Sequence, residues 1–279
     1  MGFFEEIEAD APIMWLKLNE AIADDTAFDH SGNNHHGTYH GTRTPGLPSL
    51  APGLLGTSVS LDYDGYITVP AAEWQRTLPF SAEIWFQYET GELTDNTGNA
   101  SASSDYGQLF GVTDTVWQVY PRYIGDIQPG ASLVGASVGG GLDTDNVVPR
   151  GTFHQVVFTM EGDATSTTLR VHVDGQPRPE STATFDFPFD PTIHPEVPLI
   201  IGTRNIDILA GTTHKSHYGG RVQHAMFFGQ ALSDARVLAH WLAGTRLPTP
   251  PPLRRYPRAG ATGPTRHWPR TLTRRPGTY

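Results

Sequence analysis

Carboxylates and histidines are the side chains of this sequence best suited to chemistry. Hydrolysis of a sugar bond needs two carboxyl groups that flank the bond, and Glu161 and Asp163 come nearest to such a pair. The stretch from Glu161 to Thr165 is more typical of a polar turn at the end of a strand. The absence of Cys excludes thiol catalysis, disulfide bonds and cysteine metal sites. Residue counts leave Ser-His-Asp chemistry open, but we predict that the chain is not an enzyme.

Metal binding is the second chemistry that the residues suggest. Twelve His residues occur, but the adjacent His35 and His36 would point to opposite faces of an extended segment. Polar loop histidines are therefore the favoured interpretation. Calcium prefers oxygen ligands, and Asp29 and Asn33 offer them within a segment rich in turn-forming residues. We predict that no cofactor is required and keep a structural calcium at these two residues as the metal alternative.

Sugar binding would need exposed aromatic rings beside polar groups. Trp15 and Trp85 lie in apolar stretches, so we expect both in the core. Two long segments, residues 90–106 and 124–149, are rich in Gly, Ser, Thr, Asn and Asp and predict surface loops. Aromatic residues in the segment 117–123, which leads into the second loop, and at the end of the first loop are the carbohydrate-binding candidates, with ordinary strand packing as the alternative. They are Tyr106, Trp117, Tyr120 and Tyr123.

Short β-strands must position these residues. The sequence is 38% hydrophobic, with 30 Gly and 23 Pro among 279 residues, so it can bury a core but breaks too often for a helical bundle. Short apolar or alternating runs recur along the chain and predict an all-β fold of antiparallel strands, either a sandwich or a barrel. These runs are residues 13–19, 59–63, 66–69, 81–88, 108–112, 115–120, 154–160, 168–173, 199–202 and 221–228.

One hairpin and one helix have clear local signals. Asp174-Gly175 tolerates the positive φ angles of a type I′ turn and predicts a hairpin. Ser233 is a favourable N-cap for a short C-terminal helix that we expect to end at Gly244. Its expected apolar face contains Val237, Leu238, Trp241 and Leu242.

Charge divides the chain unevenly. The net charge is −10, but residues 246–279 contain eight Arg, eight Pro and no acidic residue. This segment carries +8, and residues 1–245 carry −18. We predict three parts: an acidic, aromatic N-terminal segment (1–10), a sandwich domain (11–245) and an extended Arg/Pro-rich tail (246–279).

The order of several motifs resembles the concanavalin A-like, laminin-G-like jelly-roll family. The matching segments are Trp15-Leu16-Lys17-Leu18-Asn19-Glu20, the turn from Asp29 to Thr38, Phe80-Ser81-Ala82-Glu83-Ile84-Trp85-Phe86, Phe153-His154-Gln155-Val156-Val157-Phe158, Val171-His172-Val173-Asp174-Gly175, and Gly220-Arg221-Val222 with Ala231-Leu232-Ser233-Asp234. The resemblance implies an all-β, antiparallel two-sheet jelly-roll sandwich. It also implies sugar binding or adhesion in some members, hydrolysis in others and, in some, a structural calcium. Gln223 stands where relatives commonly carry Asp, and this removes one carboxylate from such a calcium site.

The basic tail predicts a docking partner. Its Pro residues exclude a helix or central strand, and Arg is suited to carboxylates of an acidic neighbouring subunit. Nucleic acid is the rival partner, which the acidic body disfavours. The predicted docking residues are Arg254, Arg255, Tyr256, Arg258, Arg266, Trp268, Arg270, Arg274 and Arg275.

Three features together favour a bacteriophage virion protein. The fold resembles adhesion modules, the chain has neither a disulfide nor the pattern of a secretory signal at its N-terminus MGFFEEIEAD, and the long basic tail is suited to attach the domain to another protein. No apolar run reaches the about 20 residues that span a bilayer, so we expect no membrane insertion. We predict a minor tail protein that is made in the host cytoplasm, is located in the virion, binds other virion proteins and contacts host glycans. A capsid decoration protein and a free carbohydrate-binding module are the alternatives.

Overall fold

The computed structural model describes most of the chain outside its tail. The described residues are 2–21, 24–62, 64–88, 109–113, 116–122, 130–137, 140–143, 148–149, 151–186, 188–192, 195–203 and 218–247. The chain separates into two units, Met1–Leu247 and Pro248–Tyr279. The second unit, with nearly all of the predicted tail, lies outside the described residues.

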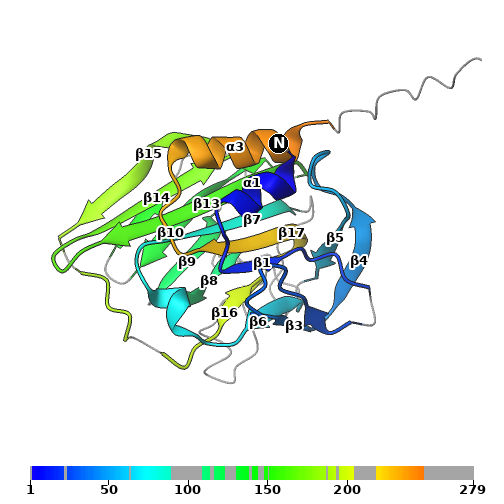
Figure 1. Cartoon of the computed structure of the whole chain (residues 1–279), viewed down its shortest axis with the longest axis horizontal. Helices are drawn as coiled ribbons and strands as arrows, with labels where there is room; N and C mark the ends of the chain where they lie inside the picture. The colour runs from blue at the N-terminus through cyan, green and yellow to red at the C-terminus, as the bar shows by residue number, and fades with distance from the viewer. Residues whose placement is uncertain are drawn as a thin grey trace, which may run out of the picture. The chain divides into compact units, whose positions relative to one another are not determined.

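Two antiparallel sheets form the first unit (Figure 1). Sheet A has the order β15 (Gln176–Phe185), β14 (Thr167–Val173), β13 (Phe153–Gly162), β7 (Phe80–Tyr88), β17 (Gly220–Phe228), β5 (Thr57–Leu61) and β4 (Arg43–Pro48), and β1 (Met14–Leu16) also pairs with β17. Sheet B has the order β11 (Gly140–Asp143), β10 (Gly130–Ser137), β9 (Trp117–Arg122), β8 (Phe110–Thr113), β16 (Leu199–Ile201), β6 (Tyr66–Val69), β3 (Gly37–His40) and β2 (Thr26–Ala27), and β12 (Val148–Pro149) also pairs with β10. The predicted all-β sandwich is confirmed.

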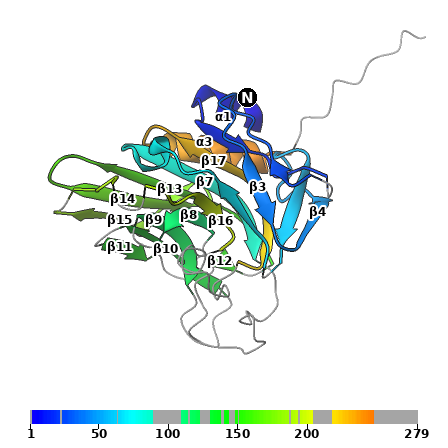
Figure 2. The ribbon, with the colours of Figure 1, turned by 90° about the horizontal axis from the view of Figure 1, so that it is seen from below.

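The sandwich has a second apolar layer outside sheet A. Alternate residues of β7 (Phe80, Ile84 and Phe86) join the core between the sheets. Trp85, on the opposite face of β7, belongs to a separate cluster with Phe3 and other residues of the helices. Figure 2 shows α1 (Phe3–Ala9) and α3 (Asp234–Thr245) lying on this outer face. Because β7 is covered on both sides, even its outward-facing polar residues Ser81 and Glu83 are fully buried beside Trp85.

Local signals predicted the Asp174-Gly175 hairpin correctly. Both residues have positive φ angles, 54° and 74°, as a type I′ turn requires. The Asp174 carboxylate bonds with His154 Nδ1 at 2.9 Å and accepts a hydrogen bond from Gln155 N at 3.0 Å. Two of the motifs that carried the family resemblance therefore contact each other across β13 and β14.

Part of the predicted glycine-rich loop 124–149 is strand. β10 and β11 pair antiparallel, with Gly135 opposite Leu142 and Ala136 opposite Gly141. The loop prediction was wrong here because sheet pairing uses backbone groups and does not need large side chains. The predicted loop 90–106 lies outside the described residues.

Helix α3 begins after Ser233 as predicted, but its buried face differs. The Ser233 side chain makes no capping hydrogen bond. The helix buries Val237 and His240, whereas Leu242 is 57% exposed. Gly244 lies within the helix rather than at its end, and a Cβ there would approach the Trp85 ring to 2.6 Å. Within the described part of the chain, no helix is long and apolar enough to cross a membrane.

Candidate functional site

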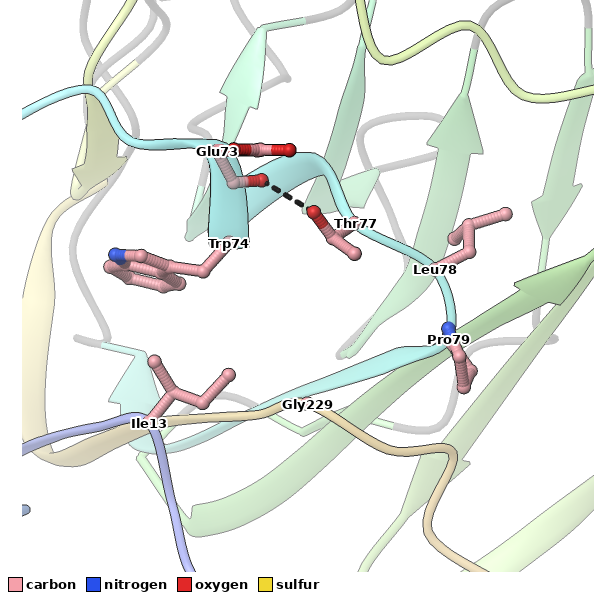
Figure 3. A pocket seen from close by; sticks show the side chains of 7 residues that line it. All are labelled: Ile13, Glu73, Trp74, Thr77, Leu78, Pro79 and Gly229. Atoms are coloured by element: carbon pink, nitrogen blue, oxygen red, sulfur yellow. Dashed lines mark hydrogen bonds between the residues drawn. The ribbon is translucent and has the colours of Figure 1, made fainter.

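A pocket of about 340 Å³ lies beside β1 and the loop that precedes β7 (Figure 3). It is lined by Ile13, Glu73, Trp74, Thr77, Leu78, Pro79 and Gly229. These residues lie just before β1, in the 3-10 helix η1 (Glu73–Arg76), in the loop before β7 and just after β17. We call this cavity the Trp74 pocket. Its lining is mainly apolar, with the polar side chains of Glu73 and Thr77, which is the composition of a small-ligand site.

Trp74 is the aromatic residue of the Trp74 pocket. Its side chain is half-buried and packs edge-on against Phe227 of the core, with ring centroids 4.8 Å apart. His35 contacts the same indole ring at 4.8 Å. The buried Trp74 Nε1–H has no hydrogen-bond partner in the described structure. Trp74 is therefore fixed by its neighbours and keeps part of its surface open.

Buried polar residues orient the 3-10 helix that carries Trp74. Gln75 is fully buried, and its Nε2 donates to Pro70 O at 2.8 Å. Arg76 is also buried and donates from Nη2 to Val197 O at 2.6 Å. Since Gln75 and Arg76 face the interior, Glu73 and Trp74 are left at the surface.

The turn that begins at Asp29 holds two sides of this site. Asp29 is buried, and its carboxylate accepts hydrogen bonds from Trp15 N, Ser31 N, Ser31 Oγ and His35 N at 2.8–2.9 Å. Burial alone would raise the pKa of Asp29, but these hydrogen bonds lower it below its ordinary value. Ser31 Oγ also lies 2.9 Å from Ile13 O, so its single hydrogen is donated to one of these two acceptors at a time. Asp29 thereby fixes both Ile13 and His35.

The same turn does not fit the predicted calcium. Both carboxylate oxygens of Asp29 already accept hydrogen bonds, and Asn33 donates from Nδ2 to Ile13 O at 2.9 Å. Gln223, in the place of the family's Asp, accepts from Leu50 N at 2.8 Å. Among the described residues no group of three or more His, Asp or Glu is arranged to hold a metal. These side chains stabilise turns instead of converging on an ion.

Trp117 is a core residue. It is fully buried, stacks on Phe158 with centroids 5.7 Å apart, and donates from Nε1 to Gln75 O at 2.9 Å. Strand packing, the alternative to its predicted role in sugar binding, is what the structure shows. Tyr120 lies in β9 opposite Val134. Tyr106, Tyr123 and all predicted docking residues of the tail lie outside the described residues.

A family comparison identifies the fold. The model of the concanavalin A-like lectin/glucanases superfamily matches residues 61–238, which is more than half of the chain. The chain belongs to this superfamily. No curated protein matches the sequence.

Solved structures of the concanavalin A-like fold include three informative neighbours. Domain 4 of AbnA, a GH43 extracellular arabinanase from Geobacillus stearothermophilus, in complex with arabinotriose, has 17% identity and a TM-score of 0.52 over 82% of this chain and 97% of its own. The receptor-binding domain of botulinum neurotoxin mosaic serotype C/D has 13% identity, a TM-score of 0.53 and coverage of 83% and 50%. The binding domain of botulinum neurotoxin DC in complex with SialylT has 13% identity, a TM-score of 0.51 and coverage of 83% and 51%. The chain thus spans about half of these toxin domains.

A superfamily that contains both lectins and glucanases makes the carboxylates important. Glu83 is fully buried on β7 and accepts from His240 Nδ1 at 2.7 Å. His240 Nε2 lies 2.8 Å from Asp10 Oδ2, and Arg236 Nε lies 2.9 Å from the same oxygen. Trp85 Nε1 donates to the other Glu83 oxygen at 3.0 Å. We call Glu83, His240, Asp10 and Arg236 the His240 network.

The His240 network joins both helices to sheet A. Burial would lower the pKa of His240, but the carboxylates of Glu83 and Asp10 raise it to about 9, so His240 is a cation at neutral pH. Both its N–H groups then have acceptors. This concanavalin A-like domain therefore holds one buried carboxylate in an ion pair beneath α3, where a substrate has no access.

The sequence alone missed Trp74 and His240. Glu73-Trp74 shows no local pattern that separates it from other polar loops, and His240 resembles a solvent-facing helix residue. One signal was available for Trp117: the alternation Trp117-Gln118-Val119 places Trp117 and Val119 on the same face, and both are buried.

Proposed function

We propose that this chain is a lectin-like carbohydrate-binding protein without hydrolytic activity, and that a sugar occupies the Trp74 pocket. The observation that carries this proposal is the half-open Trp74 ring in an apolar pocket with Glu73 and Thr77 in its lining. A pyranose has apolar faces that pack on aromatic rings and hydroxyl groups that need polar partners. The Trp74 pocket offers both.

Two structural neighbours support a sugar ligand. The AbnA domain was solved in complex with arabinotriose, and the botulinum neurotoxin DC binding domain in complex with SialylT. Their fold is shared with this chain at TM-scores of 0.52 and 0.51. Sugar binding is thus an activity that this scaffold carries in unrelated proteins.

The described carboxylates favour binding over hydrolysis. Asp163 accepts hydrogen bonds from Thr165 and Ser166 in a turn, and Glu161 lies 3.8 Å from Arg170. Glu83 is enclosed in the His240 network. Residues 135–139 match Gly-x-Ser-x-Gly, the motif that places the nucleophilic Ser of many hydrolases on a turn between a strand and a helix. Here the Ser lies in β10, which pairs with the strand β11, so the chain lacks that turn at this motif.

Substitution of Trp74 tests the proposed sugar site. We expect Trp74→Ala to weaken glycan-array binding about 5- to 30-fold, because one stacked ring contributes on the order of 1–2 kcal/mol. Phe28→Ala is the matched control, since Phe28 is an aromatic residue 43% exposed outside the pocket. Circular dichroism of both variants checks folding. Equal glycan binding by folded Trp74→Ala and native chains would exclude the Trp74 pocket.

We propose further that the protein is a bacteriophage minor tail protein. The separation of an acidic body from a tail of charge +8 supports attachment to an acidic neighbouring subunit. Unit Met1–Leu247 holds both apolar clusters and would present the sugar-binding surface, while the tail would bind other virion proteins. A capsid decoration protein or a free carbohydrate-binding module are the alternatives.

Deletion of residues 248–279 tests this attachment. We expect a folded, soluble protein that still binds glycans, because both apolar clusters lie in Met1–Leu247, but that no longer enters particles. Immunoblots of purified particles measure incorporation, and replacement of the seven Arg of residues 248–279 by Lys is the charge-matched control. Normal incorporation of the truncated chain would rule out the tail as the anchor.

A further inference from the structure

The Trp74 pocket carries a negative charge and has no positive charge in its lining. None of its seven lining residues is a cation, and Glu73 contributes a carboxylate. Figure 3 shows the Glu73 side chain on the same short helix as Trp74. The only Arg of that helix, Arg76, donates to Val197 O and Ala72 O instead, at 2.6 and 3.3 Å. An anionic ligand would find repulsion here and no ion-pair partner among the lining residues.

The apolar walls of the Trp74 pocket define the other half of the ligand. Ile13, Leu78 and Pro79 line it together with the Trp74 ring. Residues outside the pocket hold two of these walls. The backbone oxygen of Ile13 lies within hydrogen-bond distance of Ser31 Oγ, and the Trp74 ring packs against Phe227. Because these walls are held apart before a ligand binds, the protein needs to rearrange little when a methyl group is buried between them.

We propose that the Trp74 pocket selects neutral hexoses that carry a methyl group, as 6-deoxyhexoses and N-acetylhexosamines do, and rejects acidic sugars such as sialic and uronic acids. This inference rests on the proposed sugar-binding function. The methyl group packs against the apolar walls, and burial of one such group raises affinity about fourfold over the unsubstituted hexose. The Glu73 carboxylate disfavours a ligand carboxylate at the same position.

Binding of matched glycans tests the selectivity. Isothermal titration of the full chain with a 6-deoxyhexose, the parent hexose and a sialylated glycan is repeated with Trp74→Ala, and only the affinity lost in that variant is assigned to the pocket. We expect the order 6-deoxyhexose, hexose, sialylated glycan. The sialylated glycan is also attracted to the basic tail by its charge. Because salt screens this attraction, measurements at two salt concentrations separate it from binding in the pocket.

Two further variants test the two halves of the proposal separately. Glu73→Gln should raise the Trp74-dependent affinity for the sialylated glycan about fivefold and leave the affinity for the neutral sugars unchanged. The control is Glu161→Gln, which removes a carboxylate of β13 outside the pocket and should change neither affinity. Gly229→Ala places a Cβ 2.7 Å from Ile13 Cδ1. It narrows the pocket and should abolish the preference for the methyl-bearing sugar.

Each outcome has a distinct meaning. Trp74-dependent binding of the sialylated glycan as tight as that of the 6-deoxyhexose would overturn the selectivity and leave the lectin function standing. An unchanged preference in both Glu73→Gln and Gly229→Ala would overturn it as well. No Trp74-dependent affinity for any sugar would instead contradict the proposed function itself.

Discussion

Replacing His240 by Ala should lower the free energy of unfolding by roughly 3–5 kcal/mol, the cost of removing one partner from a buried ion pair. Glu83 is fully buried and would lose its cationic partner, and Asp10 would lose one of its two. Urea denaturation at pH 7 measures the change. His30→Ala is the control, because His30 is exposed and its loss should change stability by less than about 0.5 kcal/mol. A loss below about 1 kcal/mol for His240→Ala would show that the network is not stabilising.

The same network makes the domain sensitive to alkali. The pKa of His240 is raised from 6.5 to about 9 in the folded chain. Its stabilisation is fully present below pH 6.5 and is lost as the pH rises through 9. Neutral His has one N–H and cannot donate to both Glu83 and Asp10. We expect the native chain to lose about 3 kcal/mol between pH 7 and 10, and His240→Ala to lack this step.

Asp29→Ala should cost about 3 kcal/mol of unfolding free energy and also weaken sugar binding. Three backbone N–H groups, from Trp15, Ser31 and His35, lose their acceptor, and each buried unsatisfied donor costs about 1–3 kcal/mol before relaxation. His35 and Ile13 then lose their fixed positions around the Trp74 pocket. Thermal unfolding measures the stability, and titration with the same glycans measures the binding.

Two comparisons make the Asp29 prediction specific. Asp25→Ala is the control, because the Asp25 side chain is 82% exposed and contacts Arg43 instead of the backbone N–H groups around the pocket. The pKa of Asp29 is lowered, so its stabilisation is present above the ordinary Asp pKa and disappears as the pH falls through the folded value. A stable Asp29→Ala chain with unchanged sugar binding would show that this turn does not organise the site.

Local patterns predicted most of the strands because a short apolar or alternating run marks the side chains that face a core. The apolar run at residues 81–88 corresponds to β7 (Phe80–Tyr88), and the run at 221–228 to β17 (Gly220–Phe228). The strands β4 and β15 contain Pro and were missed. Both lie at edges of sheet A, where a missing N–H is tolerated.

Burial decided the roles of residues that the local pattern misjudged. Leu242 was expected on the buried face of α3, yet it is 57% exposed and His240 is buried. The apolar pattern of α3 predicted that His240 would be exposed. His240 is buried instead, because its ion pair with Glu83 offsets the free-energy cost of removing its charge from water. Trp117 similarly lies next to a predicted loop in sequence while its side chain lies in the core.

The sequence by itself determined the sandwich, the Asp174-Gly175 hairpin, the start of α3 and the separation of an acidic body from a basic tail. Each follows from residue types within a few positions of one another. Only the tertiary structure decided the Trp74 pocket and the His240 network. His240 lies 157 residues from Glu83 and 230 from Asp10 in sequence. A pocket and a shifted pKa depend on distances in space, which sheet pairing and helix docking set and no local pattern contains.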